Sequence, residues 1–261
     1  MSLKVPDKFV DMAYVKYESQ LEKEVMSGDM PAHIAIIMDG NRRFAHEMLE
    51  ASAEEGHRLG KDKLNEVIHW CLDMRIRYLT VYAFSVENFR RDAREVEFLM
   101  DLLETSLYEF ADDDEVREKG VSLRMIGDRS MLSESVNEAI DYAESKTKDH
   151  DNLKLNLAVA YGGRQEIVDS VRRISEKVRN GELDPDDIDE VLVGSYMTTG
   201  DIPDPDLILR TSGEVRISNF LLWQMAYSEL FFMDVYWPSF RRIDLLRAVR
   251  SYQNRKGRYG K

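Results

Sequence analysis

One carboxylate and two guanidinium groups follow directly after an apolar run of strand length. The run covers residues 33–38, and it is followed by Asp39, Gly40, Asn41, Arg42 and Arg43. A short apolar run that ends at a Gly-containing turn is typical of a buried parallel strand. In open α/β sheets, ligands bind beyond the carboxyl ends of such strands. Paired arginines favour phosphate, whose oxygens match the guanidinium fork. The carboxylate favours a divalent metal, since alone it would repel the phosphate. The alternative is an exposed charged turn.

Two further strand-like segments end in polar clusters. Residues 78–85 are followed by a cluster that reaches Arg91, and residues 207–210 by a cluster that reaches Asn219. A third such end, at residues 161–164, is weaker. Each cluster alone is compatible with a solvated turn, but parallel strands place their carboxyl ends at one edge of a sheet. We therefore expect two phosphate sites, one served by Arg42 and Arg43 and the other by Arg210, Arg216 and Ser218.

Several nucleotide-binding and metal-binding motifs are missing. The chain contains neither G-x-x-x-x-G-K-[ST] nor G-x-G-x-x-G after a strand, which argues against a P-loop nucleotidase and a dinucleotide-binding fold. Residues 112–116 resemble an aspartate-rich metal motif, but Val116 occupies its fifth position, so an acidic solvated loop is the favoured interpretation.

Composition restricts the class of protein. The 261 residues are 43% hydrophobic, enough for a substantial core, and the formal charge of −13 argues against a general nucleic-acid partner. The single cysteine, Cys71, excludes an intrachain disulfide and fits a packed thiol. No apolar run approaches the roughly 18 residues of a spanning helix, and no signal peptide is visible. The expected location is cytoplasmic.

Apolar periodicity predicts strands that alternate with helices. Strands are expected at 33–38, 78–85, 121–126, 153–160, 207–210 and 230–236, and helices at 7–27, 95–110, 133–147, 164–179 and 243–255. This alternation predicts an α/β fold, a single domain with a six-stranded, mainly parallel sheet flanked by helices. Residues 1–30 form an amphipathic helical extension in this interpretation, and residues 31–261 form the catalytic domain.

Several motifs together resemble those of the cis-prenyltransferases, the family of undecaprenyl and dehydrodolichyl diphosphate synthases. They are MDGNRRFA, GHRLG, YAFSVENFRR with Glu95 and Val96, YGGR, and RTSGEVRISNFLLWQMAYSE, and the ending Arg258-Tyr259-Gly260 matches the family's RxG. The resemblance covers about residues 31–260, and NRRF is closer to archaeal and eukaryotic members than to bacterial ones. It implies successive condensation of isopentenyl diphosphate onto an allylic diphosphate, farnesyl or geranylgeranyl. The product is a long-chain cis-polyprenyl diphosphate, the precursor of a glycosyl carrier lipid.

The resemblance also implies roles for individual residues. Asp39 and Glu229 would bind Mg²⁺, and Asn88 would assist loss of the isopentenyl proton. The allylic diphosphate would contact Gly40, Asn41, Arg42, Arg43, Phe44 and His57. Arg210, Arg216, Ile217 and Ser218 would hold isopentenyl diphosphate, with Gly260 reaching the partner's site in a homodimer. The same edge would be lined by Ser85, Val86, Glu87, Phe89 and Arg91. Ala83 and the helix at 95–110 would line a hydrophobic product tunnel.

Some departures and alternatives stay open. No arginine lies between Phe44 and Gly56, where bacterial members have one, and Val215 stands where they have His. Packing alone could explain His57 and Phe89. One rival function is a non-catalytic subunit of a heteromeric prenyltransferase, and another is a phosphate-ester hydrolase with Asp39 as the nucleophile. The product requires transient membrane contact, so peripheral association with the membrane accompanies the cytoplasmic expectation.

Overall fold

A parallel six-stranded sheet forms the centre of the molecule. The structure is a computed structural model that describes the backbone of residues 7–259 and the side chains of residues 16–255. The strand order is β3-β4-β2-β1-β5-β6, and every pair is parallel. The strands are β1 (His33–Ile37), β2 (Tyr78–Ser85), β3 (Val121–Ile126), β4 (Leu153–Tyr161), β5 (Leu207–Arg210) and β6 (Glu229–Phe232). The predicted α/β fold is confirmed, although β6 ends four residues earlier than expected.

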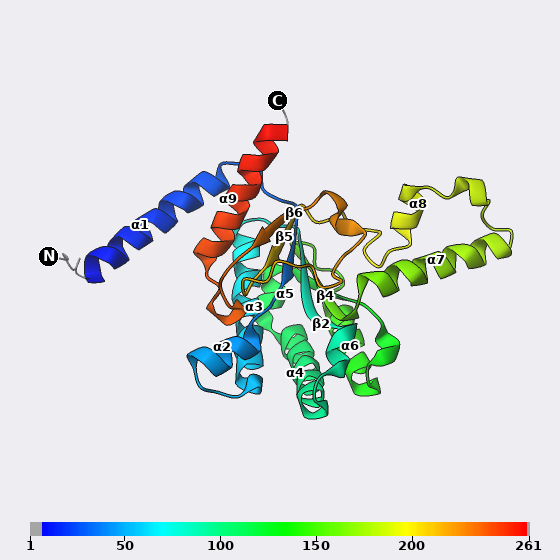
Figure 1. Cartoon of the computed structure of the whole chain (residues 1–261), viewed down its shortest axis with the longest axis horizontal. Coiled ribbons are helices and arrows are strands. Elements are labelled where there is room, and N and C mark those ends of the chain that lie inside the picture. Colours follow the sequence, from blue (N-terminus) through cyan, green and yellow to red (C-terminus); the bar gives the residue numbers. More distant parts are fainter. Residues whose placement is uncertain (1–6, 260–261) are drawn as a thin grey trace.

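Helices flank this sheet. They are α1 (Asp7–Met26), α2 (Asn41–Met48), α3 (Ala53–Asp73), α4 (Ala93–Asp112), α5 (Asp114–Lys119), α6 (Glu134–Thr147), α7 (Gly163–Arg179), α8 (Glu190–Ser195) and α9 (Arg242–Tyr259). Figure 1 shows α1 and the α7–α8 pair extending on opposite sides of the sheet, with α1 contacting α9. Among the described residues, no helix is long and apolar enough to cross a bilayer.

The two faces of the sheet carry separate hydrophobic cores. Ile34 and Ile36 of β1 belong to the larger core, which includes side chains of α3, α6 and α9. Ala35 and Ile37 point to the opposite face, because successive side chains of a strand alternate. That face is covered by a smaller core that contains Phe220. All of β1 is therefore buried, which explains its uninterrupted apolar run.

Strand order brings three of the polar clusters together. β1 lies between β2 and β5, so Ile37 has Tyr82 on one side and Arg210 on the other. The segments that follow these three strands consequently start side by side at the carboxyl edge. β2 also carries a register irregularity between Tyr82 and Phe84, which leaves Ala83 exposed within a strand that is otherwise mostly buried.

Two glycines allow α3 to approach the start of α2. Gly56 and Gly60 are four residues apart and so lie on one face of α3. A Cβ atom at Gly56 would lie 2.2 Å from the carbonyl oxygen of Asn41, and one at Gly60 would lie 2.6 Å from the Asn41 Oδ1 atom. The first and last residues of the GHRLG motif are thus glycines because larger residues would displace Asn41.

We expect Gly56→Ala to destabilise the protein. The added methyl group would lie 2.2 Å from the backbone carbonyl oxygen of Asn41, so the start of α2 must move. Overpacking of this kind costs about 1–3 kcal/mol, more than the gain of up to about 1 kcal/mol in helix propensity. Urea unfolding gives the free energy. The control is Gly194→Ala in α8, where the nearest atom to the added Cβ is 3.5 Å away. Equal stability of the two variants would contradict the packing argument.

Candidate active site

A cavity of about 690 Å³ opens at the carboxyl edge of the sheet. It is lined by twelve of the residues that the sequence singled out: Asp39, Gly40, Asn41, Arg42, Arg43, His57, Ser85, Asn88, Arg91, Arg210, Arg216 and Ser218. They come from the ends of β1, β2 and β5, from α2 and from the first turns of α3. Polar residues from separate segments therefore converge at one edge of the sheet, as expected, and together they line this cavity.

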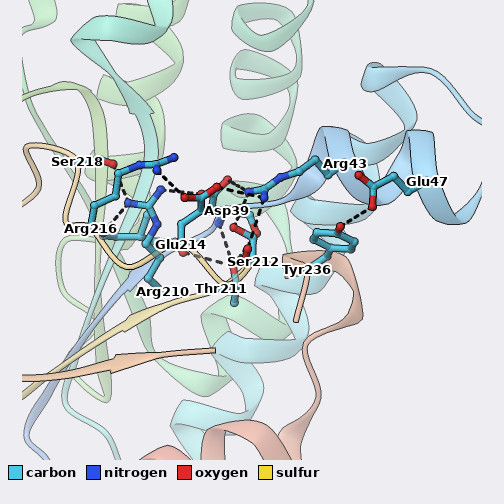
Figure 2. Close-up of polar contacts among 11 residues, drawn as sticks. Asp39, Arg43, Glu47, Arg210, Thr211, Ser212, Glu214, Arg216, Ser218 and Tyr236 are labelled. Atoms are coloured by element: carbon cyan, nitrogen blue, oxygen red, sulfur yellow. Dashed lines mark hydrogen bonds and ion pairs between the residues drawn. The ribbon is translucent and has the colours of Figure 1, made fainter. Parts of the chain in front are cut away.

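Asp39 is held between two arginines. Arg210 Nη2 donates to Asp39 Oδ2 at 2.7 Å, and Arg43 Nη2 lies 3.4 Å from Asp39 Oδ1 (Figure 2). The backbone of Asp39 is fixed as well, because the Thr211 hydroxyl donates to its carbonyl oxygen at 2.6 Å. Partial burial acts to raise the pKa of Asp39, but the hydrogen bond and charge of Arg210, with smaller effects of Ser212 and Arg43, outweigh it and lower the pKa. Asp39 is therefore a carboxylate at neutral pH.

Arg210 connects Asp39 to the loop that follows β5. Its side chain is only 4% exposed, and its Nη1 atom donates to the Arg216 carbonyl at 2.5 Å and to Ser218 Oγ at 2.7 Å. Its Nε atom is buried without a partner among the described residues. An unpaired guanidinium donor beside a cavity is chemically suited to an oxyanion such as phosphate.

The neighbouring residues Arg42 and Arg43 enter different clusters. Arg43 donates to Ser212 Oγ at 2.7 Å and lies 3.3 Å from Glu214, which in turn pairs with Arg216 (Figure 2). Consecutive residues of a helix point about 100° apart. Arg42 accordingly turns toward Glu95. Both arginines line the cavity, and their service of one phosphate site stays a prediction.

Arg42 belongs to a second cluster, centred on Glu95. The Glu95 carboxylate lies 3.5 Å from Arg42 Nη1, 3.0 Å from Arg91 Nη1 and 3.3 Å from His57 Nε2. Burial lowers the pKa of His57; Glu95 acts to raise that pKa, and Arg91 and Arg42 act to lower it. The net lowering keeps the His57 ring neutral at neutral pH. The sequence offered Glu95 only as part of a motif, without a role.

A 3-10 helix after β2 selects which residues of the SVENFRR segment reach the cavity. Residues Val86–Arg90 form this helix, and a repeat of three places Ser85, Asn88 and Arg91 on the cavity side. The Asn88 Oδ1 atom also accepts a hydrogen bond from the Ser85 backbone N–H at 3.0 Å, which fixes the turn.

Several predicted positions do not line the cavity. Val86 and Glu87 point elsewhere because of the same repeat of three, and Asn219 donates to Glu87 at 3.1 Å. Phe89 packs edge-on against Phe84 at 4.8 Å between ring centroids, as in the packing alternative. Phe44 and Ile217 also lie outside the lining, and Gly260 lies outside the described residues.

Glu229 is not close to Asp39 within one chain, so the predicted pairing is wrong there. Glu229 pairs with Leu207 at the start of β5, whereas Arg210 at the end of β5 pairs with Ile37. Glu229 therefore lies at the amino edge, and its Oε2 atom accepts from Arg255 Nη1 at 2.5 Å. The sequence correctly placed Glu229 at the start of the last strand. In a parallel sheet, however, the starts of the strands lie at the amino edge, opposite the cavity.

The protein alone does not supply a complete metal site among its described residues. No three His, Cys, Asp or Glu side chains in the described part of the chain cluster closely enough to hold an ion. Mg²⁺ is commonly held by one or two carboxylates with substrate phosphates and water. Asp39, a carboxylate that lines the cavity beside Arg43 and Arg210, fits this mode of binding. Sequence reasoning missed further lining residues. His46 and Glu47 lie outside the quoted motifs, and Tyr82 begins YAFSVENFRR without having been given a role.

Comparisons with known proteins agree on one family. A family model described as putative undecaprenyl diphosphate synthase matches residues 37–260. The tritrans,polycis-undecaprenyl-diphosphate synthase (geranylgeranyl-diphosphate specific) of Methanocaldococcus jannaschii is 51% identical over 94% of this chain and 88% of its own length. The protein of the same description from Thermococcus kodakarensis is 49% identical over 98% of this chain and 97% of its own.

Solved structures give the same answer. Lavandulyl diphosphate synthase from Lavandula x intermedia, in complex with dimethylallyl diphosphate, superposes with a TM-score of 0.80 at 37% identity, covering 88% of this chain and 96% of its own. A probable undecaprenyl diphosphate synthase from Campylobacter jejuni has a TM-score of 0.73 at 33% identity, covering 89% of this chain and 100% of its own.

We expect Asp39 to stabilise the folded protein by an amount that decreases at acid pH. The folded state lowers the pKa of Asp39. The stabilisation that the Asp39 carboxylate gives the folded protein is therefore present above its ordinary pKa of 3.8, and it is lost as the pH falls through the lower pKa of the folded state. The difference in free energy of unfolding between the wild type and Asp39→Asn should therefore shrink between pH 6 and pH 3. Urea unfolding at each pH measures it, with Asp169→Asn on α7 as the control. A constant difference would contradict the ion pair.

Proposed function

The chain belongs to the undecaprenyl diphosphate synthase family of cis-prenyltransferases, which condense isopentenyl diphosphate with an allylic diphosphate, and we propose how this chain divides the task among its residues. Two arginine clusters that line one cavity carry the proposal: Arg42 and Arg91 beside Glu95, and Arg43, Arg210 and Arg216 beside Asp39 and Glu214. Arg42, His57 and Arg91 receive the allylic diphosphate, and Arg210, Arg216 and Ser218 receive isopentenyl diphosphate. We further propose geranylgeranyl diphosphate as the starter, since the relatives at about half identity are described as specific for it.

The proposed chemistry follows from this division. The bond between C1 of the allylic group and its diphosphate oxygen breaks, and the diphosphate leaves with the electron pair. C1 bonds to C4 of the isopentenyl group, and a proton leaves C2 as the new cis double bond forms. Mg²⁺ bound with Asp39 would supply charge neutralisation for the departing diphosphate. Arg42 and Arg91 hold that diphosphate, Arg210 and Ser218 fix the isopentenyl diphosphate, and Asn88 lies where it can assist the proton's departure.

The growing chain requires an apolar path away from these charges. Ala83 and Leu99 line the same cavity as the arginines. Val96, Met100 and Leu103 of α4 are only partly buried against the larger core. We propose that the polyprenyl chain extends from Ala83 along α4, where its apolar surface is removed from water. The completed product then leaves through transient contact with a membrane.

The catalytic interpretation is favoured over both rivals. A non-catalytic subunit would not need both cationic clusters, yet both line one cavity together with Asp39. A hydrolase of simple phosphate esters would need only one phosphate-binding cluster, whereas two arginine clusters line this cavity.

One product assay tests the proposal. The purified protein alone receives radiolabelled isopentenyl diphosphate with dimethylallyl, farnesyl or geranylgeranyl diphosphate, in Mg²⁺ or in EDTA. We expect long-chain product in Mg²⁺, most efficiently from geranylgeranyl diphosphate, and none in EDTA. Product formation in EDTA would contradict the metal dependence. A need for a second protein would favour the heteromeric rival, and phosphate release without isopentenyl diphosphate would favour the hydrolase.

Exposed apolar side chains support a homodimer. On α7, Val168 and Val171 are 47% and 52% exposed, and Tyr227 before β6 is 97% exposed. Large apolar side chains at such exposure on adjoining elements are typical of a protein–protein contact. We propose a second copy of this chain as the partner.

We expect two arginine variants to separate the two diphosphate sites. Arg42→Ala should raise KM for the allylic substrate, and Arg216→Ala should raise KM for isopentenyl diphosphate. A lost charge-assisted hydrogen bond is worth about 1.5–3 kcal/mol, so each KM should rise by roughly 10- to 150-fold. Steady-state kinetics with each substrate varied in turn measure the effect, and each variant is the control for the other. Equal effects on both substrates would show that the division is wrong.

We expect the last six residues to act on isopentenyl diphosphate rather than on stability. The resemblance places Gly260 in the partner's active site, and a cut after Arg255 spares the ion pair with Glu229. The chain truncated after Arg255 should melt at the same temperature and keep its size, yet show a higher KM for isopentenyl diphosphate. Unchanged kinetics would refute the role of the tail. A monomeric truncated protein would show instead that the tail holds the dimer together.

A further inference from the structure

We propose that Glu95 is a positioning residue that assembles the allylic-diphosphate site, an inference that rests on the proposed function. Its carboxylate contacts side chains from three parts of the chain: the guanidinium of Arg42 in α2 at 3.5 Å, the ring of His57 in α3 at 3.3 Å, and the guanidinium of Arg91, which precedes α4, at 3.0 Å. Glu95 itself lies in the first turn of α4. One carboxylate therefore links α2, α3 and the segment that precedes α4.

Glu95 lies behind the cavity wall, not in it. Arg42, His57 and Arg91 line the cavity, whereas Glu95 is absent from the lining and only 13% exposed. Among the described residues, the side chains of Arg42 and Arg91 make their hydrogen bonds and ion pairs to Glu95 alone. Each guanidinium has five N–H donors, so most of them remain for a ligand.

The cluster needs a counter-charge to keep its shape. Two guanidinium groups that converge on one carboxylate would otherwise repel each other, and Arg42 is 56% exposed and free to turn toward water. Glu95 compensates this repulsion and fixes each donor group in place. A donor set that is already ordered loses less side-chain entropy when the diphosphate binds.

The sign of the effect separates positioning from simple charge. Removing a carboxylate near a phosphate site makes that site more positive, so Coulomb's law alone predicts tighter binding of an allylic diphosphate to Glu95→Gln. Loss of positioning predicts weaker binding, since Arg42 and Arg91 are no longer held. The two explanations give opposite results in one measurement.

Kinetics of Glu95→Gln test the proposal against a matched control. The control is Glu97→Gln, an exposed carboxylate two residues along the same helix. We expect Glu95→Gln to raise KM for geranylgeranyl diphosphate about tenfold or more, while KM for isopentenyl diphosphate changes about twofold at most and Glu97→Gln has no effect. A KM for the allylic substrate that is unchanged or lower would overturn the proposal.

Titration of His57 by NMR tests the contact with Glu95 directly, without substrate. His57 faces Glu95 of α4, Arg91, Arg42 of α2 and Glu54 on its own helix. Since Glu95 raises the pKa of His57 against the lowering effect of burial, Glu95→Gln should lower that pKa further. An unchanged pKa would refute the contact. If the Gln variant does not fold, Glu95→Asp replaces it in the kinetics, because its shortened carboxylate must also raise the allylic KM.

Failure of the proposed function can be distinguished from failure of this inference. A wild-type protein that makes no product contradicts the proposed function alone. Calorimetric titration with geranylgeranyl diphosphate then carries the test. Weaker binding to Glu95→Gln than to the wild type still supports the positioning role, and equal or tighter binding overturns it.

Discussion

The ion pair between Asp39 and Arg210 is the constraint on which the rest of the site depends. It joins the segment that follows β1 to the last residue of β5, and these two neighbouring strands have ends that are level at Ile37 and Arg210. Arg210 is almost fully buried, and a buried guanidinium without a carboxylate partner is strongly destabilising. The pair therefore fixes the register of the two strand ends. The same guanidinium then orients the loop by bonding Ser218.

The site shows how an acidic protein can bind diphosphates. The chain has a formal charge of −13, so its cations at the carboxyl edge are kept beside carboxylates: Arg43 lies between Asp39 and Glu214, and Arg42 and Arg91 lie beside Glu95. Such a cluster keeps only part of its positive charge before substrate arrives. Because its donors are ordered, its selectivity comes from geometry more than from net charge.

The sequence predicted the fold and the place of the site better than the partners of each side chain. Alternating apolar runs identified the strands, and the polar residues after β1, β2 and β5 located the edge. Single-sequence reasoning did not separate the contacts of Arg42 from those of Arg43, because adjacency in the chain hides the angle between neighbouring helical residues. It also placed Glu229 with Asp39, although Glu229 begins its strand at the opposite edge. Both contacts depend on tertiary geometry, which motifs do not encode.

Helix α4 relates the polar and apolar halves of the cavity. Glu95 in its first turn pairs with Arg42 and Arg91, and Leu99, one turn later, lines the same cavity as Ala83. A residue at i and one at i+4 lie on the same face of a helix, so a single face of α4 carries both contacts. Movement of α4 would therefore displace the arginines proposed to bind the allylic diphosphate together with the proposed start of the product path. The ion pairs of Glu95 hold this helix at its first turn, where the proposed diphosphate site meets the proposed path of the hydrocarbon chain.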